Sequence, residues 1–376
     1  MSPRNWKSLL DARAALCACL LIVSALALAA CGSSGDDTTG EGGGGEESAS
    51  ESVQIDVGTD TPIEAETDKP SIAYLWTSGD TNVEANKEGA EEEAERLGLE
   101  LTVFDAKFDP LRQVEQVQNV LQQDRFDAMI VIPLDTNSLC PILSKEAPSE
   151  NVAVVTQDIT LCNKLADEGP EAWIPGTLAH AGLPPAKDVN RQFYREVAEQ
   201  RGPGKHVAAL LVGPEGNSAT NSSLEALEEV EGEISDKLEV PYKIYTDFST
   251  PDGLAKTQTL LQAHPEIDTI MSIYTDLSIG AARAIDQAGR KGEVLVYDQG
   301  GSQLAADAVK RGDLALTTAF HSKKWGSEAV KAIADAFAGE EVQRYYGGYP
   351  PNSDEEENGK RLIITKENVD EYEPEY

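Results

Sequence analysis

Several residue types that would point to a particular chemistry are scarce in this chain of 376 residues. It has 31 Lys and Arg against 66 Asp and Glu, and a formal net charge of −35. So acidic a chain repels phosphates, which excludes nucleic acid as a partner. The few histidines do not have metal-site spacing, and HExxH, GxSxG and CxxC motifs are absent. The sequence therefore predicts a protein that is not an enzyme and that has neither a metal site nor a cofactor.

Long apolar runs are also lacking, apart from residues 14–30. This run follows three basic residues and ends in Leu28-Ala29-Ala30-Cys31, a pattern typical of a secretory signal. A cut before a cysteine resembles the bacterial lipobox, whose cysteine is acylated. A single transmembrane anchor is the alternative, although about 17 residues is near the lower limit for spanning a bilayer. We expect residues 1–30 to be a lipoprotein signal peptide, Cys31 to carry the lipid, and the rest to lie outside the cytoplasm.

Cysteine is rare beyond this point, where only Cys140 and Cys162 remain. They follow two neighbouring predicted strands in a chain expected to reach an oxidising compartment. A disulfide between them would close a loop of about 22 residues and contribute roughly 3 kcal/mol. Two buried free thiols are the alternative.

Residues 31–69 are rich in Gly, Ser and acidic residues and are expected to form a disordered tether. From Pro70 on, short apolar runs alternate with amphipathic stretches, which predicts an α/β fold with parallel sheets covered by helices. The rhythm breaks between 161 and 185 and then restarts, so we expect two similar doubly wound lobes. The predicted strands are 71–76, 99–104, 128–132, 152–156, 206–212, 242–247, 269–273, 294–297 and 316–320, with a last short strand at 362–365.

Polar or aromatic residues follow most of these strands. In open sheets of this kind, ligands bind beyond the carboxyl ends of the strands, so these side chains are the candidate binding residues: Trp76, Asn82, Asp135, Asp158, Asn221, Tyr274, Asp276, Asp298 and His321. Structural roles are the alternatives for several of them. Asp135 and Asp276 could cap the next helix, Trp76 could be a core or hinge aromatic, and His321 a structural histidine. The turn at Gly213–Gly216 lacks the Lys and the length of a P-loop.

Taken in order, several segments resemble the type I periplasmic substrate-binding proteins of ABC importers, in particular the sugar-binding cluster. They are the stretch from Glu88 to Asp135, VAVVTQD, TDLSIGAARAIDQAG, VLVYDQGG and FHSKKWGSEAVKAI, and the resemblance covers about 70–347. It implies two lobes joined by a three-segment hinge. Residues 70–180 with 321–347 would form the first lobe, and 181–320 with 348–376 the second.

The resemblance also implies a ligand held between the lobes, with Asp158, Asp276, Asp298 and His321 among its contacts. Sugar binders of this family usually have two arginines that are replaced here by Ile159 and Asn221. Loss of these bidentate donors predicts a neutral sugar or polyol, or a ligand carrying an amine, and disfavours an anion. We therefore expect a monomeric, lipid-anchored receptor that delivers a small ligand to a membrane permease. A tethered sensor acting through a signalling partner is the alternative.

Overall fold

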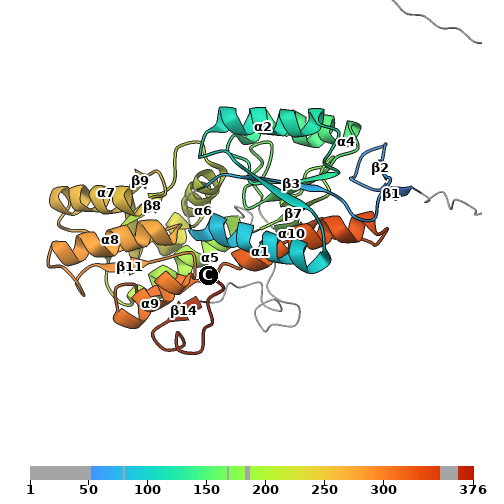
Figure 1. Cartoon of the computed structure of the whole chain (residues 1–376). Helices are drawn as coiled ribbons and strands as arrows, with labels where there is room; N and C mark the ends of the chain where they lie inside the picture. Colours follow the sequence, from blue (N-terminus) through green and yellow to red (C-terminus); the bar gives the residue numbers. More distant parts are fainter. Residues whose placement is uncertain (1–51, 79–80, 167–168, 183–186, 348–362) are drawn as a thin grey trace, which may run out of the picture. The chain divides into compact units, whose positions relative to one another are not determined.

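A computed structural model of the chain describes residues 52–78, 81–166, 169–182, 187–347 and 363–376. These residues form two α/β lobes, each built on a six-stranded sheet (Figure 1). The predicted signal peptide, Cys31 and the acidic stretch 353–357 lie outside the described residues. The predicted fold class, two doubly wound lobes with parallel sheets, is confirmed.

The first lobe has a fully parallel sheet in the order β13-β7-β6-β5-β3-β4. Its strands are β3 (Ile72–Trp76), β4 (Leu101–Asp105), β5 (Ala128–Val131), β6 (Ala153–Gln157), β7 (Ala179–Ala181) and β13 (Tyr345–Tyr346). Successive side chains of a strand face opposite sides of the sheet. Ile72 and Tyr74 accordingly belong to one buried cluster, and Ala73 and Leu75 to another.

Helices cover both faces of this sheet. The helices that contribute to the cluster of Ile72 and Tyr74 are α1 (Thr81–Leu97) and α10 (Ser322–Phe337). They pack against each other and lie side by side in Figure 1. The helices α2 (Pro110–Gln122) and α3 (Thr136–Pro141) contribute to the other cluster, that of Ala73 and Leu75. The helix that starts with α3 continues through a π-helical turn, η1 (Ile142–Glu146), into α4 (Ala147–Ser149).

The second lobe repeats this plan, with the strand order β14-β12-β11-β10-β8-β9. Its parallel strands are β8 (His206–Val212), β9 (Leu238–Tyr245), β10 (Thr269–Ser272), β11 (Leu295–Tyr297) and β12 (Leu316–Thr318), while β14 (Ile363–Thr365) runs antiparallel to β12. Its helices are α5 (Lys187–Arg201), α6 (Ser218–Ile234), α7 (Thr250–Ala263), α8 (Thr275–Gln287) and α9 (Gln303–Arg311). The chain passes from one sheet to the other after β7, after β12 and after β13.

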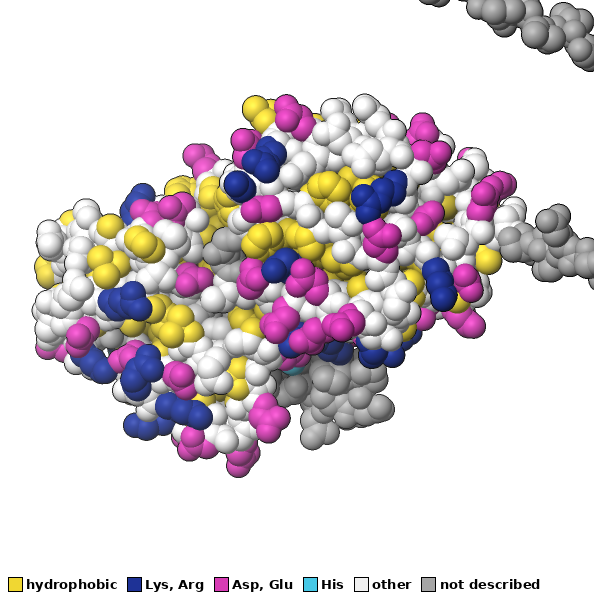
Figure 2. All heavy atoms as spheres, viewed as in Figure 1, with side chains coloured by type: hydrophobic (Ala, Val, Ile, Leu, Met, Phe, Trp, Pro, Cys, Tyr) yellow, Lys and Arg dark blue, Asp and Glu magenta, His cyan; other side chains and the backbone are white. Residues whose placement is uncertain are grey.

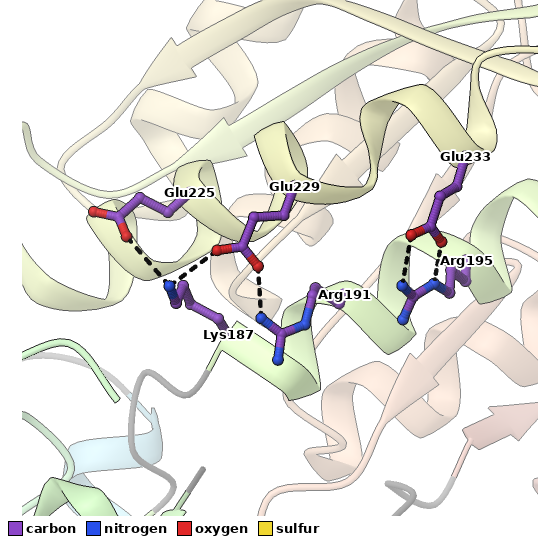
Figure 3. Close-up of polar contacts among 6 residues, drawn as sticks. All are labelled: Lys187, Arg191, Arg195, Glu225, Glu229 and Glu233. Carbon is purple, nitrogen blue, oxygen red and sulfur yellow. Dashed lines mark hydrogen bonds and ion pairs between the residues drawn. The ribbon is translucent and has the colours of Figure 1, made fainter. Parts of the chain in front are cut away.

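A row of ion pairs fastens α5 to α6 (Figure 3). Lys187 lies between Glu225 and Glu229, at 3.7 and 2.9 Å from their carboxylate oxygens, and Arg191 contacts Glu229 at 2.6 Å. Two turns along α5 from Lys187, Arg195 pairs with Glu233 of α6 at 2.8 Å. These contacts hold α6 against α5. They therefore help to fix the N-terminus of α6, which lies at the edge of the second sheet where the strands of that sheet end.

The prediction of a disordered tether is wrong for residues 53–65. They form an antiparallel hairpin of β1 (Val53–Ile55) and β2 (Ile63–Ala65). Alternating apolar residues give this segment a buried side that joins the first-lobe core. At its turn, Gly58 has φ +71°, and a Cβ there would lie 2.3 Å from the Trp173 ring.

Candidate functional site

A cavity of ≈ 550 Å³ lies where the strands of both sheets end. In the first lobe it is lined by the segments that follow β3, β4, β5 and β6. In the second lobe the lining comes from the segments that follow β8, β9, β10 and β11. The cavity therefore occupies the place that open parallel sheets use for ligands.

Four of the nine predicted binding residues line this cavity: Asn82, Asp135, Asp158 and Tyr274. The other five do not belong to its lining: Trp76, Asn221, Asp276, Asp298 and His321. The hydrogen-bond partners of the residues in each group are described in turn below.

Asp158 is held at the cavity wall by a buried network of polar side chains. Tyr74 donates its hydroxyl hydrogen to Gln157 (2.8 Å), and Gln157 donates to Asn86 (2.9 Å). Asn86 and Asn82 then donate their amide hydrogens to the same carboxylate oxygen of Asp158, Oδ2. Asp158 also has φ +56°, in the left-handed region that a non-glycine residue seldom adopts. Such conformations persist where the surroundings fix them, and they concentrate at functional sites.

Asp135 both caps α3 and lines the cavity. It accepts hydrogen bonds from the backbone N–H groups of Asn137 and Ser138, at 3.1 and 3.0 Å, and from the Ser138 hydroxyl at 2.6 Å. The Ser138 hydroxyl and then the backbone donors lower the pKa of Asp135. The two roles that the sequence left open for this residue are therefore compatible, and its carboxylate is ionised at neutral pH.

Asp298, predicted to be a ligand contact, is fully buried behind the cavity. Its oxygens accept hydrogen bonds from the hydroxyls of Thr275 (3.0 Å), Thr317 (2.5 Å) and Ser278. Burial raises the pKa of Asp298 to about 6, against the opposing effect of these donors. The sequence placed this residue correctly at the end of a strand but could not show that three hydroxyls enclose it.

The remaining four do not line the cavity themselves, and each has a hydrogen-bond partner within the protein. Asp276 accepts from the Thr250 hydroxyl (3.0 Å), and burial raises its pKa. Trp76 donates to the carbonyl oxygen of Val83 (3.3 Å). His321 pairs through Nδ1 with Glu375 (2.8 Å), and Asn221 donates to the backbone of Gly216 (3.4 Å). Asp276 does not cap α8, because the N-cap of that helix is Tyr274 and has no side-chain capping bond. The side chains of these four residues therefore contact other parts of the protein.

Two phenylalanines that the sequence analysis did not single out line the cavity from opposite lobes. Phe108 lies between β4 and α2, and Phe248 lies between β9 and α7, so they occupy equivalent places in the two lobes. Both have positive φ, +59° and +66°. Phe108 is 49% exposed, and Phe248 packs edge-on against Tyr274 with centroids 5.7 Å apart. The sequence does contain a short signal, because each phenylalanine lies two or three residues before a proline in the first turn of a helix.

Two buried polar atoms of lining residues lack a hydrogen-bond partner within the described parts of the chain. They are the hydroxyl of Ser218, at the start of α6, and the indole N–H of Trp325, in α10. Buried polar groups usually find partners in proteins. A hydroxylated ligand in the cavity is one source of such partners.

The cavity lining carries charge of one sign. It includes three carboxylates, Asp135 and Asp158 of the first lobe and Glu215 of the second, whereas no Lys, Arg or His is among the described residues that line it. The outer surface differs, because acidic and basic side chains are intermixed over the face shown in Figure 2.

A disulfide joins the two first-lobe segments that carry Asp135 and Asp158. Cys140 of α3 is bonded to Cys162, which follows β6, and the Cα atoms are 4.8 Å apart. Next to it, the backbone N–H of Cys162 donates to the carbonyl of Thr136 (3.0 Å). Of the alternatives that the sequence left open, the structure therefore has the bonded pair.

Two features are absent from the described residues. No helix in these parts of the chain is both long and apolar enough to cross a bilayer. No group of three or more His, Cys, Asp or Glu side chains within the described ranges is placed to share a metal ion.

Residues 72–341 match the family described as periplasmic binding protein domain. Among characterised proteins, the ribose import binding protein RbsB of Bacillus subtilis is 28% identical over 258 residues, which cover 69% of this chain and 78% of that protein. A xylitol-binding protein of Mycolicibacterium smegmatis is 26% identical over 286 residues, covering 76% of each chain.

Solved structures agree with the fold. An ABC transporter solute-binding protein from Bacillus halodurans with bound myo-inositol superposes with a TM-score of 0.68 at 23% identity, covering 82% of this chain and 99% of that one. A periplasmic solute-binding protein from Actinobacillus succinogenes with bound D-allose also gives 0.68, at 24% identity and with coverages of 81% and 100%.

Proposed function

Because this chain belongs to the periplasmic binding protein family, we propose that it is the solute-binding receptor of an ABC importer and that its ligand is a small sugar or polyol. Members of this family are binding proteins, and the relatives above are named for ribose and xylitol. The observation that carries the proposal is the cavity, to which the strand ends of both lobes contribute.

The walls of the cavity suit a hydroxylated ring or chain. Phe108 and Phe248 present aromatic surface from opposite lobes, against which the C–H groups of a sugar can pack. Asp158, Gln299 and Ser218 provide hydrogen-bonding groups around them. Small-molecule sites commonly combine apolar walls with a few placed polar groups in this way.

Delivery follows from the two-lobe plan. A ligand that contacts both lobes binds the closed arrangement more tightly than the open one, and it shifts the equilibrium by that difference in affinity. A permease that recognises the closed arrangement would then receive loaded receptor.

The test is isothermal titration of the purified protein with ribose, allose, xylitol, myo-inositol and their amino and acidic analogues. We expect at least one of these compounds to bind, and we expect Phe248→Ala to weaken that binding, because it removes an aromatic wall. Leu304→Ala is the control, since Leu304 is an exposed apolar residue outside the cavity lining. Absence of heat from every sugar and polyol in the panel would contradict the proposal.

The attachment to the membrane is part of the same proposal. We infer acylation of Cys31 from the segment Leu28-Ala29-Ala30-Cys31 and the apolar run before it. When cells that express the protein are grown with a labelled fatty acid, the protein should become labelled. Cys31→Ser should abolish this labelling and release the protein from the membrane fraction. Equal labelling of both forms would refute the anchor.

A further inference from the structure

We infer that Ser322, which lies outside the cavity lining, is a positioning residue that sets ligand affinity by holding Asn82 in place. The inference rests on the proposed function and deepens it, because it concerns how occupancy of the same cavity is coupled to closure of the lobes. It depends on three hydrogen bonds that Asn82 makes with three different parts of the protein.

The first observation is that the side-chain amide of Asn82 is bonded at both ends. Its Nδ2 donates to Oδ2 of Asp158 at the cavity wall (3.0 Å), and its Oδ1 accepts from the hydroxyl of Ser322. An asparagine amide has its donor and its acceptor on one rigid group. With Oδ1 held by Ser322, Nδ2 faces the carboxylate, so the Ser322 hydroxyl determines which way this amide points.

The second observation is the position of Ser322. It is the first residue of α10, and the chain reaches it directly after crossing from β12 in the sheet of the second lobe. It is fully buried, and it does not belong to the described lining of the cavity. A ligand in the cavity would therefore not contact Ser322, and this residue can influence binding only through its neighbours.

The third observation is the close contact between α1, which carries Asn82, and α10, which carries Ser322. One turn after Ser322, a Cβ at Gly326 would lie 1.9 Å from the backbone oxygen of Asn86 in α1. Glycine permits this approach because it has no Cβ. Backbones packed so closely do not slide past each other readily, so the start of α10 keeps its place beside Asn82.

The fourth observation is that Asn82 also reaches the opposite lobe. Its backbone N–H donates to the hydroxyl of Tyr274 (3.2 Å), which follows β10 in the second lobe and lines the cavity. One residue thus joins the cavity wall, the crossing segment and the second lobe. Loosening Asn82 would disfavour the arrangement in which the lobes meet, and a smaller binding-competent population lowers the apparent affinity in proportion.

The first test is the affinity of Ser322→Ala. The probe is whichever of ribose, allose, xylitol and myo-inositol binds the native protein most tightly. We expect Ser322→Ala to bind it about 3- to 10-fold more weakly, the usual effect of one hydrogen bond, and mainly through faster dissociation. An affinity equal to that of the native protein would overturn the inference.

Ser327→Ala is the matched control for this change. Ser327 lies on the same helix outside the cavity lining, and its hydroxyl bonds Glu93 of α1. The control therefore also loses a hydroxyl that joins α10 to α1, and we expect it to bind the probe as the native protein does. A loss of affinity equal to that of Ser322→Ala would overturn the inference, because any loosening of the two helices would then suffice.

A double-mutant cycle tests whether Asn82 is the route. In the Asn82→Ala background the bond to Ser322 is already gone, so adding Ser322→Ala should change the affinity by less than about twofold. A merely structural role of Ser322 would not produce this dependence on Asn82. The same loss in both backgrounds would overturn the inference, since Ser322 would then act through packing alone.

A third measurement needs no ligand. Spin labels on Gln118→Cys of α2 and Thr259→Cys of α7, both exposed sites, report the distance between the lobes in the Cys31→Ser protein. These helices follow β4 and β9, which lie at the sheet edges opposite β13 and β14. We expect Ser322→Ala to shift the distance distribution to longer values than in the native protein and Ser327→Ala. An unchanged distribution overturns the inference, even if Asn82→Ala does not fold.

The outcomes separate the inference from the proposed function. If none of the four compounds binds, the receptor function is contradicted, while the distance measurement still decides whether Ser322 favours the closed arrangement. If one of them binds equally well to the native protein and to Ser322→Ala, the inference is overturned and the receptor function stands.

Discussion

The backbone N–H of Asn82 donates a hydrogen bond to the hydroxyl of Tyr274 at 3.2 Å. Asn82 lies in the first turn of α1 in the first lobe, whereas Tyr274 precedes α8 in the second. Both residues line the cavity. This bond therefore joins the two lobes beside the proposed ligand.

Removing the hydroxyl should weaken the closed arrangement. We expect Tyr274→Phe to reduce ligand affinity about 2- to 10-fold, the usual effect of one hydrogen bond of about 0.5–1.5 kcal/mol. Tyr245→Phe is the matched control, because Tyr245 is 41% exposed on β9 and is not part of the lining. Titration calorimetry of the two variants decides the matter, and equal affinities would show that the interlobe bond does not contribute.

Gly182 should be required for the position of Asp158. Its φ is +142°, and a Cβ at this position would lie 2.6 Å from the backbone nitrogen of Asp158. We expect Gly182→Ala to lower the free energy of unfolding by roughly 1–3 kcal/mol and to weaken ligand binding, because Asp158 must move.

The control for this change is Gly204→Ala. Gly204 has a similar φ of +123°, but the nearest atom to its Cβ would be 3.5 Å away. It shares the backbone cost of alanine at positive φ without the steric clash. Urea unfolding and ligand titration of both variants separate the two effects. A similar loss in the two would attribute the result to backbone conformation alone.

Asp298 should make stability depend on pH in the acidic range. Its folded pKa is raised to about 6 from an ordinary value of 3.8. Below pH 4 the group is protonated in both states, and between pH 4 and 6 only the folded state retains the proton. Its contribution therefore falls as the pH rises through this window, by up to about 3 kcal/mol at 1.36 kcal/mol per pKa unit.

This linkage is measured by comparing unfolding free energies of the native protein and Asp298→Asn between pH 4 and 7. The variant cannot ionise, so the difference between the two proteins should change across the window in favour of Asn at higher pH. Asp307→Asn, on the second-lobe helix α9, is the matched control for the replacement of an aspartate by asparagine. Parallel curves for the native protein and Asp298→Asn would refute the prediction.

The disulfide should contribute to the stability of the first lobe and to the geometry of its acids. Cys140 and Cys162 are 22 residues apart, so replacing both by serine should cost about 2–4 kcal/mol. The segments that carry Asp135 and Asp158 would also lose their covalent link, and we expect weaker ligand binding. Thermal unfolding with and without a reductant checks the first effect, which should be absent in the double variant. A native protein that reductant does not destabilise would contradict it.

The sequence predicted the alternation of strands and helices well because buried parallel strands are apolar runs and their helices are amphipathic. It missed β7 and β13, since these strands of three and two residues are too short to show a pattern. The β1–β2 hairpin was missed because it follows directly on a stretch rich in glycine and acidic residues.

The site was predicted less completely than the fold. Sequence placed polar residues at strand ends, and Asp135, Asp158 and Tyr274 do line the cavity. It could not distinguish Asp158, which is held by two amides at the wall, from Asp298, which is enclosed by three hydroxyls. That distinction depends on contacts between residues far apart in the sequence. Phe108 was missed because an exposed aromatic in a loop has no periodicity.

The β1–β2 hairpin determines where a tether preceding residue 53 joins the folded protein. Arg344 donates to Asp56 at 2.7 Å and stacks on Trp173 at 4.8 Å, so the hairpin is fastened to the first lobe. The lipid proposed at Cys31 would thus be joined to the first lobe, and closure on a solute would move the second lobe relative to the attached one. A fluorescent donor on the hairpin and an acceptor on α7 would turn that movement into an optical reading of solute concentration.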